Sequence, residues 1–457
     1  MSYLLDDEGR TAAIRLLPLR KGGLRDWQKL ASDAHGQWAA TSGFEARQGQ
    51  VLALPDSDGR LQSIVFGMQE NGWLYQLASI YKSLPPGNYV LDSDWNDEQV
   101  GQASLGWGLA AYAFDRYRKA NEKPRQLYLD KQTAKTVPPL CQAQCLVRDL
   151  VNTPTEHMGP AELAAAVKAE ADRFGARFRV VSGDELLTEN FPAIHAVGRA
   201  SVSEPRLVEL AWGDEAAPLL ALVGKGVCFD TGGLDLKTTS GMGLMKKDMG
   251  GAAHALALAR LVMEYKLPIR LLLLIPAVEN SVAGNAYRPG DVITTRKGLH
   301  IEIGNTDAEG RVVLSDALAF ACEHEPDLVI DFATLTGAAR VALGADLPPL
   351  FSNDADVSRE MLKAGEQKED PMWGMPLYQP YVELIKSPIA DLNNSAKSPY
   401  GGCITAALFL EHFVTEDTPW VHIDTFAWNQ SNRAGRPEGG EALGLRAVFA
   451  YLQERYS

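Results

Sequence analysis

Hydrophobic residues in the second half of the chain alternate between short continuous runs and longer segments with helical periodicity. The runs at 219–223 and 269–275 are almost wholly apolar, which is typical of strands that helices cover on both faces. The predicted strands cover 176–181, 207–212, 219–223, 269–275, 300–303 and 328–332, and the predicted helices 162–174, 250–265 and 311–324. This alternation predicts an α/β domain with a mostly parallel central sheet flanked by helices.

The first 130 residues carry shorter apolar runs, at 50–54, 63–66 and 126–129, which predict a second, smaller α/β domain. No residue cluster in this part indicates chemistry. We predict an N-terminal α/β domain over 1–136 and a larger catalytic domain over 137–457, which begins with a connecting helix over 137–153. A length of 457 residues agrees with two or three domains.

Composition and charge narrow the class of protein. Hydrophobic residues at 46% and charged residues at 22% exclude disordered and fibrous classes. A net charge of −14 disfavours nucleic acid and anionic lipid as partners and favours divalent cations. The longest apolar run, 271–278, contains Pro276 and is too short to span a membrane. The N-terminal segment is acidic where a signal peptide would be basic, so we expect a cytoplasmic protein.

The cysteines indicate a reducing compartment, because the chain has five of them and no CxxC motif. Cys141 and Cys145 lie one helical turn apart among apolar residues, and Cys228 is flanked by Val227 and Phe229. We expect all three to be buried packing residues. His254 lies among apolar residues of a predicted helix, so we expect it in the core and not at a metal.

Two acidic loops follow predicted strands and hold the candidate chemistry. The first, 224–251, is rich in glycine, but Phe229 replaces the third glycine of a GxGxxG motif and no GxxxxGK[ST] motif occurs. Nucleotide binding is therefore disfavoured. The charged residues of this loop that we single out are Lys225, Asp230, Lys237 and Asp248.

The second loop follows the predicted strand at 300–303 and offers Asp307, Glu309 and Arg311. We expect an extended segment here, in which residues two apart face the same way and converge. Carboxylates from both loops would repel one another unless cations lay between them, and two divalent ions about 3.5 to 4 Å apart would form a hydrolytic site. Arg311 opens a predicted helix, where the helix dipole disfavours a cation, so it indicates an anion-binding position.

Each of these residues also has a purely structural interpretation. Asp248 would cap the helix that starts at 250. Asp307 and Glu309 would belong to a turn and a first helical turn. Lys225 and Lys237 would be solvated or salt-bridged lysines. Taken together, these structural interpretations do not explain why two glycine-containing loops both carry several acidic residues.

Five motifs closely resemble the leucyl aminopeptidase, or cytosol aminopeptidase, family. They are VGKGVCFDTGG (223–233), LKTTSGMGLMKKDMGGAA (236–253), NAYRPGDV (285–292), NTDAEGRVVLSDAL (305–318) and ATLTGA (333–338). The NTDAEGR motif is highly specific, and the similarity covers most of the chain from about Val147 onward. The resemblance implies a two-domain subunit, a two-metal site in the C-terminal domain and a homohexamer.

The resemblance also implies roles for single residues. Lys225, Asp230, Asp248 and Glu309 match the ligands of one metal. The second metal would take Asp230, Asp307 and Glu309, so that Asp230 and Glu309 bridge. The ions implied are Mn²⁺ or Zn²⁺, with Mg²⁺ as a further candidate.

The two catalytic cations of the family match Lys237, which would stabilise an oxyanion, and Arg311, which would hold a bicarbonate ion as proton shuttle. Met245, Thr334 and the carbonyl of Leu335 match positions that line the substrate pocket. The implied reaction is hydrolysis of the N-terminal residue from peptides with a free N-terminus, through a water that bridges two metals.

Two other functions remain as alternatives. A two-metal phosphoesterase would also use carboxylates with lysine and arginine. A non-catalytic or DNA-binding regulator could share the fold, although the net charge of −14 argues against nucleic acid as the main partner.

Overall fold

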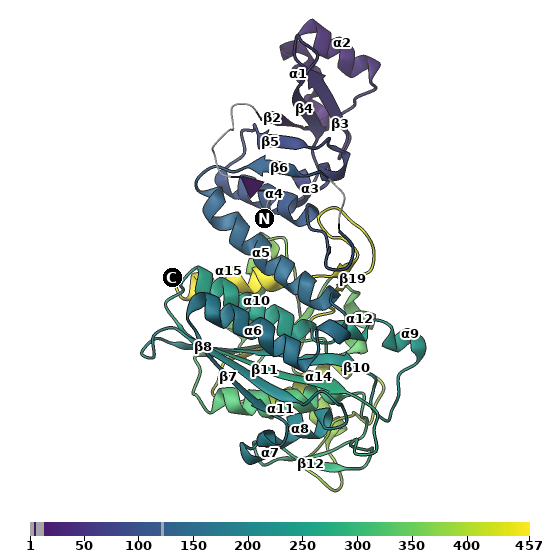
Figure 1. The fold of residues 1–457 in the computed structure, drawn as a ribbon, viewed down its shortest axis with the longest axis vertical. Helices are drawn as coiled ribbons and strands as arrows, with labels where there is room; N and C mark the ends of the chain where they lie inside the picture. The colour runs from purple at the N-terminus through teal and green to yellow at the C-terminus, as the bar shows by residue number, and fades with distance from the viewer. Residues whose placement is uncertain (1–3, 6–12, 120–122) are drawn as a thin grey trace. The chain divides into compact units, whose positions relative to one another are not determined.

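The computed structural model describes residues 4–5, 13–119 and 123–457, and the chain divides into two compact units (Figure 1). The N-terminal unit comprises Met1–Cys145 with Ser431–Glu438, and the C-terminal unit Leu146–Gln430 with Gly439–Ser457. The division falls inside helix α5 (Thr133–Asn152), which covers most of the helix expected over 137–153. The domain boundary itself stays a prediction, and most of the acidic N-terminal segment lies outside the described residues.

The N-terminal unit is built on a six-stranded sheet. Its strands are β1 (Leu4–Leu5), β2 (Ile14–Leu19), β3 (Val51–Pro55), β4 (Leu61–Gly67), β5 (Gly87–Leu91) and β6 (Arg125–Tyr128), in the order β1-β6-β5-β2-β4-β3. Only the β3–β4 pair is antiparallel among these described strands. Its helices are α1 (Leu24–Leu30), α2 (Asp33–Thr41), α3 (Tyr75–Ala78) and α4 (Asp97–Ala110). Trp107 of α4 is fully buried against Tyr81 and Tyr89, so aromatic packing forms the centre of this core.

The C-terminal unit contains a nine-stranded mixed sheet. Its strands are β7 (Arg177–Ser182), β8 (Arg206–Trp212), β9 (Leu219–Gly224), β10 (Gly226–Asp230), β11 (Arg270–Asn280), β14 (Leu328–Ala333), β15 (Pro349–Ser352), β16 (Trp373–Gly374) and β18 (Trp420–Asp424). The order is β16-β15-β18-β14-β9-β11-β8-β7, with β10 paired to β11. Strands β11, β9, β14 and β18 run parallel, and every residue of β9 is buried. The prediction of a mostly parallel sheet covered on both faces is confirmed.

Helices cover both faces of this sheet. Figure 1 shows α6 (Pro160–Phe174), α10 (Gly250–Glu264) and α15 (Leu445–Arg455) on one face, and α8 (Pro192–Gly198), α11 (Glu309–Cys322) and α14 (Gly402–Glu411) on the other. The remaining helices are α7 (Glu185–Thr188), α9 (Thr239–Met242), α12 (Gly337–Leu343) and α13 (Ala355–Gln367). The small strands β12 (Val292–Thr294), β13 (His300–Glu302) and β17 (Leu392–Asn393) form one sheet, and β19 (Trp428–Asn429) pairs with β20 (Gly439–Gly440).

Two segments differ from the prediction. Strand β10 occupies 226–230, where we expected a loop. These residues extend the sheet by pairing with residues 277–280, the C-terminal part of β11. Helix α11 begins at Glu309, two residues before the predicted start. The extended segment expected at 307–311 is therefore wrong, since Glu309 and Arg311 are helical.

The cysteines and His254 lie where we expected them. All five cysteines are free and buried. The ring of His254 is fully buried, with Nδ1 2.6 Å from the carbonyl oxygen of Gly250, while Nε2 accepts a hydrogen bond from the backbone N–H of Leu443 at 3.0 Å. Both ring nitrogens therefore have hydrogen-bond partners inside the core.

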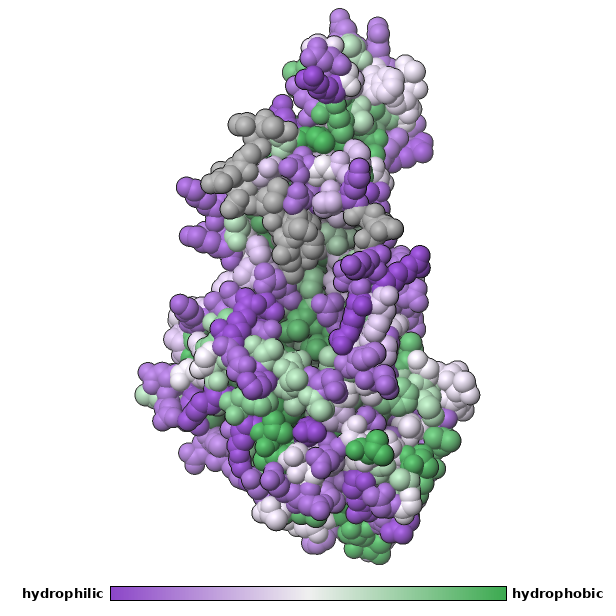
Figure 2. All heavy atoms as spheres, viewed as in Figure 1, coloured by the Kyte–Doolittle hydropathy of each residue, from purple (hydrophilic) through white to green (hydrophobic). Residues whose placement is uncertain are grey.

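Figure 2 shows hydrophilic side chains over most of the visible surface of the described chain, with hydrophobic side chains in small patches between them. In the described part of the chain, no helix combines the length and the apolar character that a membrane crossing requires.

Candidate metal centre

The candidate residues gather where the parallel strands of the C-terminal unit end, the edge at which α/β sheets bind ligands. Lys225 directly follows β9, Asp230 is the last residue of β10, and Thr334 directly follows β14. Asp248 precedes α10 by two residues, and Glu309 is the first residue of α11. The two acidic loops identified in the sequence therefore meet at one place.

Lys225 lies between two carboxylates in the interior. Its Nζ atom is 2.7 Å from Oδ2 of Asp248 and 2.8 Å from Oε1 of Glu309, and it donates a hydrogen bond to the carbonyl of Thr334 at 3.0 Å. A Cβ atom on Gly310 would lie 2.5 Å from Cε of Lys225, so glycine at 310 leaves the room that the lysine fills. Lys225 is not a solvated surface lysine.

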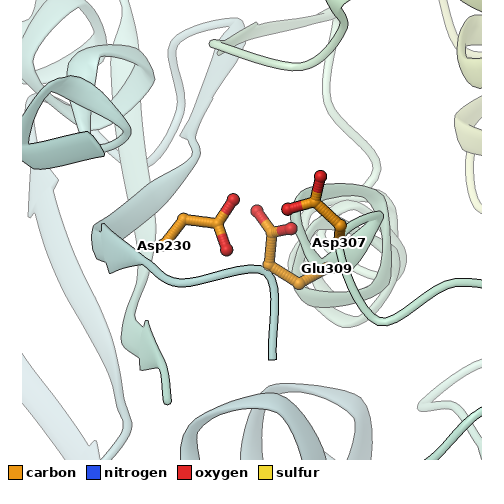
Figure 3. A group of neighbouring side chains, drawn as sticks. All are labelled: Asp230, Asp307 and Glu309. Atoms are coloured by element: carbon orange, nitrogen blue, oxygen red, sulfur yellow. The ribbon is translucent and has the colours of Figure 1, made fainter. Parts of the chain in front are cut away.

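Three carboxylates point toward one another beside this lysine (Figure 3). Asp230, Asp307 and Glu309 each offer one oxygen, and these oxygens all lie within 4.8 Å of one another. Lys237 pairs with two of them, since its Nζ lies 2.8 Å from Oδ2 of Asp230 and also contacts Oδ1 of Asp307. Carboxylate oxygens at this spacing are suitable ligands for divalent cations such as Mn²⁺ and Mg²⁺.

The electrostatics of the cluster show an excess of negative charge. Burial and the charge of Asp248 raise the pKa of Asp230 to about 6. Burial, and then the charge of Asp230, raise the pKa of Glu309 to about 8. Repulsion of this kind is relieved by bound cations, and cation binding in turn releases protons from the ligands. The cluster therefore fits divalent metal ions.

The two lysines counter part of that charge. Burial alone would lower the pKa of Lys225, but Asp248 and Glu309 raise it above its ordinary value. For Lys237, burial is again outweighed, here by Asp230, and its pKa is also raised. Burial would raise the pKa of Asp248, but Lys225 holds it below its ordinary value.

The capping role considered for Asp248 is wrong. The N-cap of α10 is Met249, and its side chain makes no cap hydrogen bond. The Oδ1 atom of Asp248 instead accepts a hydrogen bond from the hydroxyl of Thr334 at 2.7 Å. Asp248 faces the cluster and not the start of the helix.

Arg311 lies beside the carboxylates on the same helix as Glu309. Its guanidinium donates to the carbonyl of Asn394 at 2.7 Å, and burial lowers its pKa to about 10. It lines a cavity of about 250 Å³ together with Asp307 and Leu335. A buried cation at the wall of such a cavity is suited to bind a small anion.

The three residues expected to line a substrate pocket lie around the same edge of the sheet. Met245 is half-buried at the start of a short turn before Asp248, Thr334 is buried, and Leu335 is half-buried at the cavity. The backbone N–H of Leu335 donates to Oδ1 of Asp424 at 2.9 Å, which fixes the loop after β14.

Two polar residues outside the set of predicted site residues make hydrogen bonds to the acidic loops. Asn280 is fully buried, and its Nδ2 donates to Oδ1 of Asp230 at 2.8 Å and to the carbonyl of Thr306 at 3.0 Å. The hydroxyl of Tyr287 donates to the same Thr306 carbonyl at 2.6 Å. The one available signal was a polar residue, Asn280, at the end of a strongly apolar strand.

The fold and this cluster define a two-domain α/β protein with a carboxylate-rich, candidate metal-hydrolase centre. The family model "Cytosol aminopeptidase family, catalytic domain" matches residues 145–449, and "M17 aminopeptidase, N-terminal domain" matches residues 14–130. The chain belongs to the cytosol aminopeptidase family. The resemblance stated from the motifs is thereby confirmed.

Individual proteins agree with this assignment. A probable cytosol aminopeptidase of Roseiflexus castenholzii is 42% identical over 314 residues, which are 68% of this chain and 64% of that relative, so the match spans less than two thirds of the relative's length. The crystal structure of a cytosol aminopeptidase from Coxiella burnetii is 49% identical, covers 99% of both chains and has a TM-score of 0.97. The bottromycin maturation enzyme BotP in complex with Mn is 32% identical, covers 98% of this chain and 100% of BotP, and has a TM-score of 0.88.

Proposed function

We propose that this protein is a metal-dependent aminopeptidase that removes the first residue from peptides with a free N-terminus. The observation that carries the proposal is the convergence of Asp230, Asp307 and Glu309 within 4.8 Å in a chain of the cytosol aminopeptidase family. Bound divalent ions supply a Lewis acid and a water that ionises near neutral pH.

Two groups of residues would hold the metals. Lys225, Asp230, Asp248 and Glu309 would bind one ion, and Asp230, Asp307 and Glu309 the other, with Asp230 and Glu309 shared. Burial, together with repulsion from the neighbouring carboxylates, raises the pKa of Glu309 to about 8, and this unfavourable charge supports the assignment. Because the related BotP is a manganese complex, Mn²⁺ is the first ion to test, followed by Zn²⁺ and Mg²⁺.

Lys237 would stabilise the negative charge that develops on the scissile carbonyl. Its raised pKa keeps it protonated at neutral pH, and its Nζ already lies 2.8 Å from a carboxylate of the cluster. A fixed cation at this position lowers the energy of an oxyanion more than it lowers that of the neutral carbonyl.

Arg311 would hold a bicarbonate ion, whose oxygens would relay a proton between the attacking water and the leaving amine. Its burial and its place at the wall of the 250 Å³ cavity support this role, because a desolvated guanidinium binds an oxyanion strongly. Met245, Thr334 and Leu335 would contact the substrate beside the metals.

We further propose that the protein acts in the cytoplasm, which the cysteine pattern favours, and that it is a homohexamer, which the family resemblance implies. The experiment that tests the function compares three substrates for the purified protein with Mn²⁺: leucine p-nitroanilide, p-nitrophenyl phosphate and duplex DNA. We expect metal-dependent release of nitroaniline alone. Phosphate release would favour the phosphoesterase alternative, and DNA binding without hydrolysis the regulator.

A further inference from the structure

Asn394 is a fully buried residue that follows β17 and lies against the loop that carries Asp307. Its Oδ1 atom accepts hydrogen bonds from the backbone N–H groups of Gly304 at 2.8 Å and Asn305 at 3.2 Å. Its Nδ2 atom donates to the carbonyls of Asn305 at 2.7 Å and Ala308 at 3.3 Å. The amide thus uses both acceptor positions and both donors, which is the full capacity of an asparagine side chain.

The main-chain carbonyl of Asn394 also contacts the guanidinium of Arg311. The carbonyl of Asn394 accepts a hydrogen bond from Nη1 of Arg311 at 2.7 Å, while Nε of Arg311 has no hydrogen-bond partner within the described chain. The orientation of the guanidinium therefore depends strongly on this one carbonyl. Asn394 contacts both the loop of Asp307 and the side chain of Arg311.

The loop of Asp307 needs such support. Residues 303–308 lie between β13 and α11 without regular structure, and the side chain of Asp307 is one-third exposed, at 33%. Its own N–H donates to Oδ1 of Asn305, a residue that Asn394 holds by both its N–H and its carbonyl. Asn394 thus holds the main chain on both sides of Asp307, although it lies 89 positions further along the chain than Asn305.

We propose that Asn394 is a positioning residue that fixes the carboxylate of Asp307 and the guanidinium of Arg311 in one geometry. The inference rests on the proposed function, since it takes Asp307 as a metal ligand. Residues that orient metal ligands typically change metal affinity or activity 10- to 100-fold when they are replaced. Asn394 itself touches neither metal nor substrate.

The test is the substitution Asn394→Asp, which keeps the size and the two acceptor contacts but places an oxygen against the carbonyls of Asn305 and Ala308. We expect the affinity for Mn²⁺, measured by calorimetric titration of chelator-treated protein, to fall 10- to 100-fold. The main-chain carbonyl that Arg311 contacts remains in this variant, but it should shift with the loop. We therefore also expect kcat for leucine p-nitroanilide to fall at saturating Mn²⁺.

The matched control is Asn353→Asp. Asn353 makes the same kind of contacts, with Nδ2 donating to the Thr418 carbonyl at 2.9 Å and Oδ1 accepting from the Trp420 N–H at 2.8 Å. These contacts lie at the start of β18, the end of that strand away from the carboxylates. We expect Asn353→Asp to change the unfolding temperature without changing Mn²⁺ affinity or kcat.

The outcomes separate this inference from the proposed function. If wild-type protein binds no Mn²⁺ or cleaves no leucine amide, the proposed function fails. If wild type does both and Asn394→Asp keeps its affinity and kcat within twofold, the positioning role is overturned. Should Asn394→Asp not fold, Asn394→Ser keeps one donor and one acceptor, and unchanged Mn²⁺ affinity in that folded variant would equally overturn the inference.

Discussion

The Nζ atom of Lys225 lies 2.7 Å from Asp248 and 2.8 Å from Glu309, and each of the three side chains is less than 5% exposed. The two carboxylates come from separate loops, so a single lysine joins the two acidic segments of the chain. The single positive charge of the ammonium offsets one of these two negative charges. A metal at the same place would require the amine to lose its proton first.

Lys225→Arg distinguishes a structural cation from a metal ligand. Arginine keeps the positive charge but cannot deprotonate to offer a lone pair, so we expect loss of one metal and of most activity. Plasma emission spectrometry gives the metal content per subunit. Two metals per subunit in the variant, with activity near wild type, would show that Lys225 is only a structural cation.

Glu309→Gln removes a carboxylate assigned to both metals, and we expect it to abolish peptidase activity without unfolding the protein. Since the pKa of Glu309 is raised to about 8 in the metal-free protein, its contribution to stability is present at low pH. That contribution declines as pH rises from about 4.5 towards 8. The metal-free variant should therefore be at least as stable as wild type above pH 8, measured by urea unfolding.

The control for this substitution is Glu302→Gln on β13. The carboxylate of Glu302 accepts a hydrogen bond from the hydroxyl of Ser387 and does not belong to the carboxylate cluster. We expect near-normal activity from it. Turnover by Glu309→Gln equal to that of Glu302→Gln would refute the two-metal assignment.

Arg311→Lys keeps a positive charge but loses the planar fork that binds an oxyanion with two parallel hydrogen bonds. We expect a lower kcat, with KM for leucine p-nitroanilide almost unchanged. Activity of the wild-type protein should rise when bicarbonate is added to bicarbonate-free buffer, and activity of the variant should not. An equal response of both proteins would speak against the bicarbonate role.

Gly310→Ala tests the space around Lys225. A Cβ atom at 310 would lie 2.5 Å from Cε of the lysine, so the side chain must move away from the carboxylates. We expect weaker metal binding and lower activity, although alanine favours a helix. Gly101→Ala in α4 has nothing within 4 Å of the added atom, and there we expect a gain of about 0.5–1 kcal/mol in unfolding free energy.

His422 and Asp331 form a buried ion pair across β18 and β14, with Nδ1 2.6 Å from Oδ1. Burial alone would lower the pKa of His422, but the negative charge of Asp331 outweighs burial, so the pKa lies above its ordinary value of 6.5. The charge of Asp424 also raises this pKa, and the charge of Arg311 lowers it. A raised histidine pKa stabilises the fold below 6.5, and this contribution is lost as pH rises through the raised value. The unfolding free energy of wild type relative to His422→Asn should therefore fall as pH rises above 6.5, and a pH-independent difference would contradict this.

Local patterns in the sequence predicted the α/β architecture and the charged candidate residues, whereas Met245, Thr334 and Leu335 were named only from the family resemblance. The apolar runs at 219–223 and 269–275 became the fully or almost fully buried strands β9 and β11, because a strand covered on both faces has no polar face to show. The charged residues Lys225, Asp230 and Glu309 stood out because each follows a strand end in a glycine-containing loop.

Tertiary contacts decided what the local pattern could not. Strand β10 forms only because β11 is long enough to pair with it, and α11 starts at Glu309 and not at 311. Asn280 and Asn394 fix the two acidic loops through hydrogen bonds to residues 26 to 90 positions away in the chain. Periodicity reports only neighbours within a few residues, so partners at such separations become visible only once the chain has folded.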